Sequence, residues 1–436
     1  MSSPDSLPRS DLLDTLARLG VASSAQLQVA LGKSQPTLSR ALGEMAREVV
    51  VLGRQRSARY ALLHDILGLP GQQPLWWTDE RGARFEWGQL SHLGSERLHV
   101  QARGINVLTQ GSLPWFLAPM RLQGFLGRLL ARSPLAAGYD SNPERWRLDQ
   151  LLALLLREVH DLPGAISLGP ELDDQLSLAP ADLAQRRAHH DAQAESLSKT
   201  RPVGSSAGGE QAKFIARDAL GQRHLIVKFT PPRGTPFGER WHDLLHAETL
   251  ASQTLAAHGV PVAETRVLES AQRSYLESTR FDRLGAKGRR HVVPLDAVHD
   301  AFVPGPRRHW AATCEALVRQ RRLPHEAGAQ VQALLAFGHL IGNSDMHFGN
   351  LSLVASGPEA VARGRFTLAP VYDMLPMRWR PDVATGELGL TPFSPNDADL
   401  ASPARPVARE FWARAEAHAP LSRAFRMLAA TMASRI

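Results

Sequence analysis

Apolar residues recur at helical spacing in the first part of the chain and predict three short helices followed by a hairpin. Gly20 ends the first helix, Ser24 is expected to cap the second, and Ser34 opens the third. Apolar runs on both sides of the segment Gly-Arg-Gln-Arg-Ser then predict a strand, a turn and a second strand within residues 49–62. We therefore expect residues 1–65 to form a winged helix-turn-helix domain.

Residues 66–195 carry a less regular pattern. Tryptophans alternate with glycines and prolines, as they do in short strands joined by loops. The leucine-rich segment 148–159 predicts a buried helix, whereas residues 182–194 predict a polar helix covered by solvent. This pattern favours a small β-rich subdomain.

The composition becomes small and polar at the expected start of a third domain, residues 196–300. Two mainly apolar runs, 213–216 and 224–229, predict a hairpin, and the apolar positions of residues 241–258 predict a helix. Residues 301–436 are expected to form a helical domain. The helices expected there cover residues 310–319, 326–341 and 407–436.

Side chains suited to phosphoryl transfer follow one another in the second half of the chain. This reaction needs a carboxylate for the attacking hydroxyl, an amide and a second carboxylate for Mg²⁺, and a lysine for the nucleotide phosphates. Asp345 would be the base, and Asn350 and Asp373 would bind Mg²⁺. Lys228 would contact phosphate, and Glu248 in the following helix could hold it by an ion pair. This order is typical of a kinase.

Each of these residues also has a simpler interpretation when it is considered alone. Asp345 and Asp373 could be ordinary turn residues, and Asn350 could be a helix cap. Lys228 could lie on an edge strand, and Glu248 could belong to a solvated helix face. Only the order of the five residues favours the kinase interpretation.

Residues 204–213, Gly-Ser-Ser-Ala-Gly-Gly-Glu-Gln-Ala-Lys, form a glycine-rich segment. Small residues let backbone N–H groups approach phosphates, but neither standard nucleotide-loop pattern is present. A flexible linker between domains is the alternative interpretation.

The composition excludes some classes of protein, such as disulfide-linked and membrane-spanning chains. The formal net charge of +7 is spread over 436 residues, so it indicates a nucleic-acid partner only weakly. The single cysteine, Cys314, excludes an internal disulfide and a cysteine-rich zinc site. No apolar run is long enough for a membrane helix and no export signal is visible, so a cytoplasmic location is expected.

Five segments of the chain occur in a characteristic order: SSAGGEQAKF, LIVKF, RFDR, GNSDMHFGN and PVYDMLP. Together they resemble the HipA family of serine/threonine kinases, the toxin components of bacterial toxin-antitoxin systems. The resemblance spans roughly residues 200–380, and residues 66–195 would correspond to the small N-terminal subdomain of that family. With a winged helix in front, the chain is most similar to the YjjJ/HipH-like branch.

The resemblance implies a role for each matching residue. Asp345 matches the catalytic aspartate, and Asn350 and Asp373 match the magnesium ligands. Lys228 matches the lysine that contacts the ATP phosphates. His347 belongs to the catalytic loop, although a core histidine bonded to the backbone is the alternative.

In the HipA family, a serine of the glycine-rich loop is autophosphorylated, which ejects the loop and silences the kinase. Ser206 matches this serine best, and Ser205 competes with it. Ala212 stands where family members often carry proline or an acid, and Thr279 replaces the acid expected before RFDR. The implied nucleotide contacts are Ser206, Ala207, Gly208, Gly209, Lys213, Lys228 and Glu248.

The N-terminal domain carries side chains suited to DNA. Polar residues of its third helix could reach phosphates and base edges, and arginines follow on the wing. The expected contact residues are Ser34, Gln35, Thr37, Ser39, Arg40, Arg54 and Arg56. A protein-interaction module with solvated arginines is the alternative.

The sequence thus predicts an α+β chain in which a winged helix and a β-rich subdomain precede a two-lobed kinase-like body. ATP and Mg²⁺ are the expected cofactors. The first hypothesis is a serine/threonine kinase acting on a protein such as an aminoacyl-tRNA synthetase or another translation factor, with DNA and an antitoxin as further partners. The alternatives are a small-molecule phosphotransferase and a DNA-binding regulator whose kinase-like domain is inactive.

Overall fold

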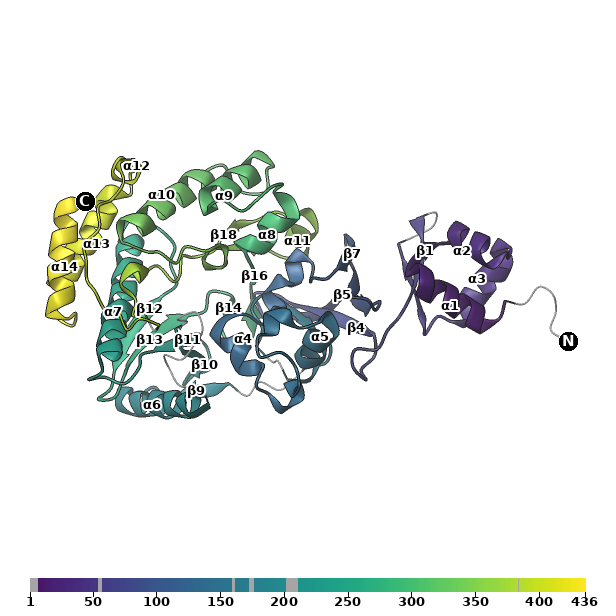
Figure 1. Cartoon of the computed structure of the whole chain (residues 1–436), viewed down its shortest axis with the longest axis horizontal. Coiled ribbons are helices and arrows are strands. Elements are labelled where there is room, and N and C mark those ends of the chain that lie inside the picture. Colours follow the sequence, from purple (N-terminus) through teal and green to yellow (C-terminus); the bar gives the residue numbers. More distant parts are fainter. Residues whose placement is uncertain (1–6, 54–56, 159–160, 172–175, 201–210, 383) are drawn as a thin grey trace.

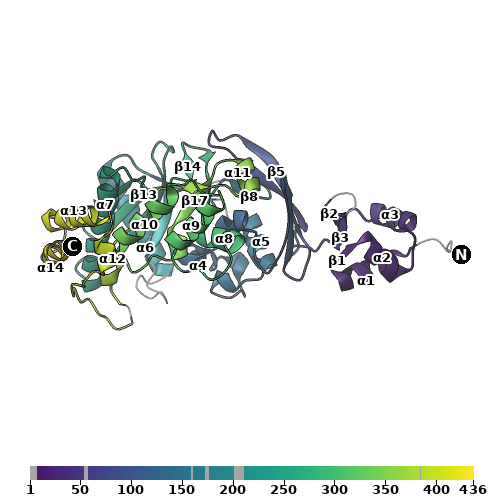
Figure 2. The same ribbon diagram turned by 90° about the horizontal axis from the view of Figure 1, so that it is seen from above.

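The computed structural model describes residues 7–53, 57–158, 161–171, 176–200, 211–382 and 384–436. The molecule is elongated, with a small N-terminal unit at one end and the C-terminal helices at the other (Figures 1 and 2). Two sheets and a helical region lie between them. Within the described residues, no helix combines the length and the apolar character that crossing a bilayer requires.

The described part of the N-terminal unit has the helices and strands that the sequence predicts, together with one additional strand. Its helices are α1 (Arg9–Leu19), α2 (Ser24–Leu31) and α3 (Gln35–Glu44). They pack on an antiparallel sheet of order β1-β3-β2, made of β1 (Val21–Ser23), β2 (Val49–Leu52) and β3 (Arg59–Leu62).

The cap of α2 differs from the prediction. Ser23, not Ser24, caps this helix, because its side chain accepts from the Gln26 backbone N–H while Gln26 Oε1 accepts from the Ser23 N–H. Ser34 caps α3, as the sequence predicts.

An apolar cluster joins the N-terminal unit to the next sheet. Leu52 and Ala61 pack against Leu93, which comes directly after β5 (Arg84–His92). Gly20 has a φ of +73°, a conformation that favours glycine, and it lies against the Arg97 guanidinium, 2.0 Å from where a Cβ would be. The N-terminal unit therefore contacts the rest of the protein through more than the connecting segment.

The middle region contains a five-stranded antiparallel sheet in the described residues, with the order β7-β6-β5-β4-β8. The other strands are β4 (Gln72–Thr78), β6 (Arg97–Ala102), β7 (Ile105–Gln110) and β8 (Ile166–Leu168). The middle region also contains two α-helices, α4 (Gly124–Leu130) and α5 (Leu148–Arg157). All the leucines of α5 are buried, which confirms the predicted buried helix.

A second five-stranded sheet of the described chain has the order β12-β13-β11-β10-β9. The predicted hairpin is present as the antiparallel pair β10–β11. Helix α7 (Pro236–Ala257) contacts β12 and β13. The strands are β9 (Ser177–Ala179), β10 (Lys213–Asp218), β11 (His224–Phe229), β12 (Thr265–Glu269) and β13 (Ser274–Thr279).

Two expectations for residues 177–200 were wrong. Helix α6 (Leu183–Thr200) is not simply covered by solvent, because its Arg186 and His190 side chains are buried and both contact Glu277 of β13. Strand β9, which precedes this helix, pairs in parallel with β10. The boundary expected at residue 196 therefore falls inside α6, and the second sheet begins earlier in the chain.

Helices dominate the last third of the chain, with a small sheet β16-β17-β18 beneath them. One long helix expected at 407–436 is instead two, α13 and α14, separated by a connector that contains Pro420. The boundary expected at residue 300 falls inside α8. The helices are α8 (Leu295–Phe302), α9 (Trp310–Arg319), α10 (Ala327–Leu340), α11 (Pro358–Arg363), α12 (Asp397–Leu400), α13 (Arg405–Ala417) and α14 (Arg423–Arg435), and the strands are β14 (Arg283–Leu284), β15 (Gly288–Arg289), β16 (His291–Pro294), β17 (Ser352–Ala355) and β18 (Thr367–Leu368).

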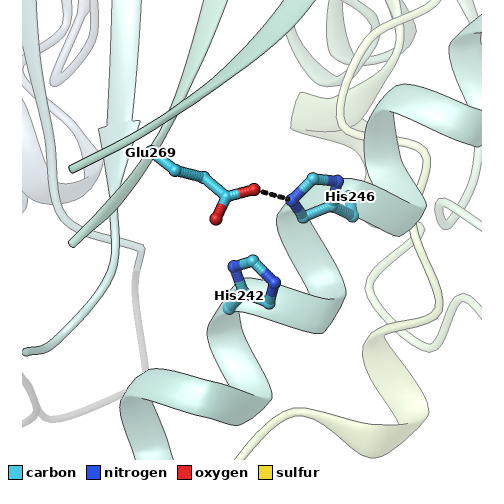
Figure 3. Close-up of side chains that lie close together, drawn as sticks. All are labelled: His242, His246 and Glu269. Atoms are coloured by element: carbon cyan, nitrogen blue, oxygen red, sulfur yellow. Dashed lines mark hydrogen bonds and ion pairs between the residues drawn. The ribbon is translucent and has the colours of Figure 1, made fainter. Parts of the chain in front are cut away.

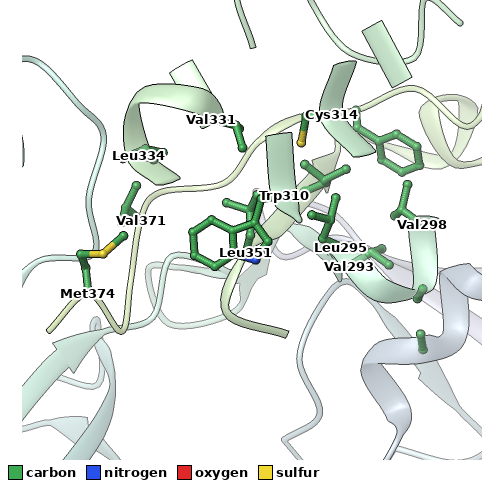
Figure 4. Packing of buried hydrophobic residues seen from close by; sticks show 14 of the residues in the cluster. Val293, Leu295, Val298, Trp310, Cys314, Val331, Leu334, Leu351, Val371 and Met374 are labelled. Atoms are coloured by element: carbon green, nitrogen blue, oxygen red, sulfur yellow. The ribbon is translucent and has the colours of Figure 1, made fainter. Parts of the chain in front are cut away.

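A continuous apolar core connects the helical region to the middle region. Trp310, Val331 and Leu351 pack within it, and Cys314 is a small buried side chain, as the sequence indicates (Figure 4). The ring of Trp115 from the middle region contacts Phe302 at a centroid distance of 5.3 Å. Burying each such side chain contributes roughly 1.5–3 kcal/mol, so this core holds α9 and α10 in place.

Candidate active site

A cavity of about 500 Å³ lies where the second sheet meets the helical region, and most of the kinase candidates line it. The sheet contributes Lys213 and Lys228, and the segment after α10 contributes Asp345. The middle region contributes Phe125 and Glu144. The other candidates on its wall are His347, Asn350 and Asp373.

Lys228 lies at the centre of a buried ion cluster. Its Nζ atom lies 2.6 and 2.7 Å from the two carboxylate oxygens of Glu248, so the ion pair expected from the sequence is present. Nζ also donates to Asp373 Oδ1, which is 145 residues away along the chain. One ammonium is thus shared between two carboxylates.

The electrostatics of this cluster follow from burial and from the shared ammonium. Burial alone would lower the pKa of Lys228, but Asp373 and Glu248 outweigh it and raise that pKa, so the lysine stays charged. Burial would raise the pKa of Asp373, yet Lys228 and Lys213 lower it to about 2. Burial and the neighbouring Asp373 raise the pKa of Glu248 despite its contact with Lys228.

The segment after α10 holds Asp345 by its backbone. Gly342 ends the helix with a φ of +76°, and the buried Asn343 accepts a hydrogen bond from the Asp345 N–H at 3.0 Å. The Asn350 side-chain amide donates to the Asp345 carbonyl at 2.7 Å. Within the described residues the Asp345 carboxylate itself makes no hydrogen bond or salt bridge, so it remains available to a ligand in the cavity.

His347 is exposed, which contradicts the alternative that it is a core histidine. Its Nδ1 atom accepts a hydrogen bond from the Gly349 N–H at 3.0 Å and caps the 3₁₀ turn Phe348–Asn350. Its carbonyl accepts from Trp310 Nε1 at 3.0 Å. These contacts fix the shape of the loop around Asp345.

Asp373 adopts a left-handed backbone conformation, with φ +53°, that is uncommon for a residue with a side chain. Its neighbours hold it there: the Val371 carbonyl accepts from the Ala263 N–H at 2.8 Å, and the Tyr372 hydroxyl donates to the Gly349 carbonyl at 2.7 Å. Tyr372 therefore ties the backbone at Asp373 to the loop of Asp345 and Asn350.

Sequence reasoning missed the residues that join these segments. Asn343 lies two positions before Asp345, and an asparagine that bonds the backbone two residues later is a known turn signal that could have identified it. Nothing in the local pattern marks Tyr372 or Trp310, because their partners lie in other elements.

Lys213 lines the same cavity, and its side-chain ammonium makes no hydrogen bond or salt bridge in the part of the chain that the structure describes. Burial lowers the pKa of its ammonium, although the nearby Asp373 opposes this shift. The remaining candidates of the glycine-rich segment lie outside the described residues: Ser205, Ser206, Ala207, Gly208 and Gly209.

The oxygen donors around Asp345 fit a hard divalent cation. Asn350 uses its amide nitrogen on the Asp345 carbonyl, which leaves its side-chain oxygen for a ligand. Asp373 uses Oδ1 on Lys228, and its second oxygen makes no hydrogen bond or salt bridge with the described residues. Carboxylate and amide oxygens are ligands that Mg²⁺ accepts.

One of the expected DNA-binding residues is not available on the surface. Thr37 is buried, because its position on α3 faces the leucine core of the N-terminal unit, and it contacts the capping Ser34 side chain. Four other candidates on or before α3 are exposed: Ser34, Gln35, Ser39 and Arg40. Arg54 and Arg56 lie outside the described residues.

Comparisons with known proteins agree with the arrangement of the chain. Residues 205–435 match the model of the HipA-like C-terminal domain, and residues 69–176 match that of the YjjJ-like toxin middle domain. The chain is 35% identical to Toxin YjjJ of Escherichia coli (strain K12), and the match covers 98% of this chain and 97% of the relative.

A solved structure shares the fold. It belongs to the Shewanella oneidensis MR-1 complex of the toxin-antitoxin system HipA, HipB and its operator DNA. The TM-score is 0.50 at 15% sequence identity, and the match covers 83% of this chain and 95% of that one.

Proposed function

Because the chain belongs to the HipA-like toxin family, in its YjjJ-like branch, we propose that it is an ATP- and Mg²⁺-dependent serine/threonine protein kinase. The observation that supports this most is the convergence of Lys228, Asp345 and Asp373 on one cavity. These three residues come from distant parts of the chain, and each has the chemistry that one step of phosphoryl transfer requires.

Asp345 accepts the proton of the substrate hydroxyl. At the same time, the hydroxyl oxygen attacks the terminal phosphorus of ATP and ADP leaves. Its carboxylate suits this role because its backbone is held by Asn343 and Asn350 while the side chain remains unpaired among the described residues. Lys228 binds phosphate oxygen, and Glu248 holds its ammonium in place.

Asn350 and Asp373 hold Mg²⁺, which when bound neutralises charge on the phosphates. Lys213 supplies a further ammonium from the neighbouring strand of the hairpin, where it faces Lys228 in the antiparallel register and lines the same cavity. His347 shapes the loop through its Nδ1 atom, which accepts from the Gly349 N–H, and its Nε2 atom makes no hydrogen bond with the described residues.

We propose that the glycine-rich segment carries the autophosphorylated serine, Ser206 or Ser205. Gln211, in the described part of this segment, donates its side-chain amide to the Phe229 carbonyl at 2.7 Å and so lies beside the end of β11. A phosphoserine carries a charge of about −1.5 to −2, which would compete with ATP phosphates for the same donors.

The experiment is intact-mass measurement after incubation of the purified protein with MgATP. We expect a phosphate adduct that maps to Ser206 or Ser205 and that is absent from Asp345→Asn. The exposed Asp65→Asn is the matched control and should keep the adduct. Absence of both an adduct and ATP turnover would exclude the kinase and the small-molecule phosphotransferase, and would leave a DNA-binding regulator.

We expect the protein substrate to be an aminoacyl-tRNA synthetase or another translation factor. Phosphoproteomics after brief expression can identify it. Phosphosites that appear with the wild type and not with Asp345→Asn would identify it. Turnover that requires only a small hydroxyl compound would instead support the alternative phosphotransferase. An antitoxin partner and a cytoplasmic location stay predictions.

We also propose that the N-terminal unit binds DNA as a winged helix. Exposed polar side chains on α3, including Gln35 and Arg40, support this proposal. Replacing Arg54 and Arg56 by alanine should weaken binding about equally for all DNA sequences and flatten its salt dependence. Arg414→Ala, in the C-terminal helix α13, is the control. Unchanged retention on DNA by the wing variants would contradict the proposal.

A further inference from the structure

A second group of ligand-type side chains lies outside the cavity, between α7, β12 and the connector of α13 and α14. His242, His246 and Glu269 each offer one ligand atom, and these atoms lie within 4.8 Å of one another (Figure 3). The two histidines are buried and lie four residues apart, so they share one face of α7. Glu269 ends β12 and faces them.

Each histidine has one ring nitrogen occupied by a partner outside this group. His242 Nε2 lies 3.0 Å from the Pro420 carbonyl, which can only accept, so Nε2 carries the proton and Nδ1 keeps its lone pair. His246 Nδ1 lies 3.0 Å from His418 Nε2, which leaves Nε2 facing Glu269 Oε1 at 3.1 Å. Histidines that bind metals usually have such an outer partner.

The separation of one pair of ligand atoms suits a tetrahedral ion, and all three ligand atoms lie within 4.8 Å of one another. Ligand atoms at about 2.0–2.1 Å from zinc lie about 3.3 Å apart, close to the separation of His246 Nε2 and Glu269 Oε1. Arg233 Nη1 binds the other oxygen of Glu269 at 2.8 Å and leaves Oε1 for the ion. The Ser274 hydroxyl, 2.8 Å from His242 Nδ1, can rotate away when that nitrogen binds.

From this geometry we propose that His242 Nδ1, His246 Nε2 and Glu269 Oε1 bind one Zn²⁺, with water as the fourth ligand. Two neutral imidazoles and one carboxylate form a ligand set that binds zinc in preference to magnesium.

The ion would connect α7 to β12, and through the outer partners to the connector of the C-terminal helices. His246 lies two residues before Glu248 on α7, so zinc would restrict the helix that carries the partner of Lys228. Without metal, the same groups form a hydrogen-bonded network in which His246 Nε2 donates to Glu269. Metal uptake distinguishes the two arrangements.

The test uses full-length protein without a histidine tag, treated with a chelator, and then titrated with Zn²⁺ against a chromogenic zinc indicator in excess Mg²⁺. We expect one zinc per chain with a Kd below about 1 μM and a raised Tm. Glu269→Gln and His242→Ala should weaken binding at least about 100-fold and abolish the Tm shift. His418→Ala should weaken it about 10- to 100-fold, as loss of an outer partner does.

Two controls separate this site from the candidate active site and from exposed histidines. Asp345→Asn and the exposed His325→Ala should both keep stoichiometric zinc. Glu269 is partly exposed, so Glu269→Gln keeps the test interpretable if His242→Ala fails to fold. A wild-type chain that takes up no zinc, or undiminished uptake in Glu269→Gln, would overturn the proposal whether or not the protein is an active kinase.

Discussion

The candidate active site and the junction between the two five-stranded sheets both bury charged side chains, but they pair them differently. In the cavity, Lys228 is shared by Glu248 and Asp373, while Asp345 and Lys213 have no ionic partner among the described residues. Three carboxylates there face two ammonium groups. This cluster leaves charge available to a ligand.

At the junction, two arginines of the RFDR segment face two aspartates and all four are paired. Arg280 and Arg283 each bind both Asp161, from the middle region, and Asp282. The Gly164 N–H also donates to Asp282 at 3.1 Å. The segment that resembles a family motif is thus a structural link between the two sheets.

The pKa values reflect this difference. At the junction, burial would raise the pKa of each aspartate, but the two arginines lower both, that of Asp161 to about 2. In the cavity, Glu248 has a raised pKa because burial and the neighbouring Asp373 outweigh the attraction of Lys228. Complete pairing is typical of a structural cluster, and incomplete pairing beside a cavity is typical of a functional one.

The largest expected effect comes from Lys228→Met. Removing the ammonium should lower ATP turnover about 1,000-fold, because no other group holds the phosphate at this position. The folded protein should lose little stability, since Glu248 can take up a proton and the cavity admits water. Steady-state kinetics and thermal unfolding measure the two effects. A large fall in Tm with retained turnover would contradict the functional role of the Lys228 cluster and would indicate a structural one.

Arg283→Met should affect stability rather than chemistry. It leaves Asp161 and Asp282 buried with one arginine between them, and breaking a buried pair in this way costs about 3–5 kcal/mol. Urea unfolding measures this cost. Arg290→Met is the matched control, because the pair of Arg290 with Glu80 is partly exposed and contributes about 1 kcal/mol or less. Equal losses in both variants would contradict the structural role.

The smallest effect is an acid dependence of stability. The pKa of Asp161 is about 2 in the folded protein and 3.8 in its unperturbed state, so its contribution is present above pH 3.8 and is lost as the pH falls toward 2. In Asp161→Asn, the change in unfolding free energy between about pH 5 and pH 2 should be smaller by about 2 kcal/mol. An identical pH dependence in the variant and the wild type would refute this prediction.

The spacing of apolar residues predicted the elements that bury one face of their own side chains. Hairpin β10–β11 and helix α9 lie where the apolar spacing places them, since each buries one face of its own side chains. The same reasoning failed for α6, whose polar sequence suggests solvent. Its Arg186 and His190 are buried because both bind Glu277, about ninety residues later in the chain.

The amino-acid sequence alone showed the resemblance to a toxin family, because residue type and order are properties of the chain itself. It also showed the order of the kinase candidates Lys228, Glu248, Asp345, Asn350 and Asp373. Which carboxylates share the ammonium of Lys228, and which remain unpaired, was decided only by the tertiary structure. Electrostatic pairing depends on distance and burial, and folding sets both between residues that are far apart along the chain.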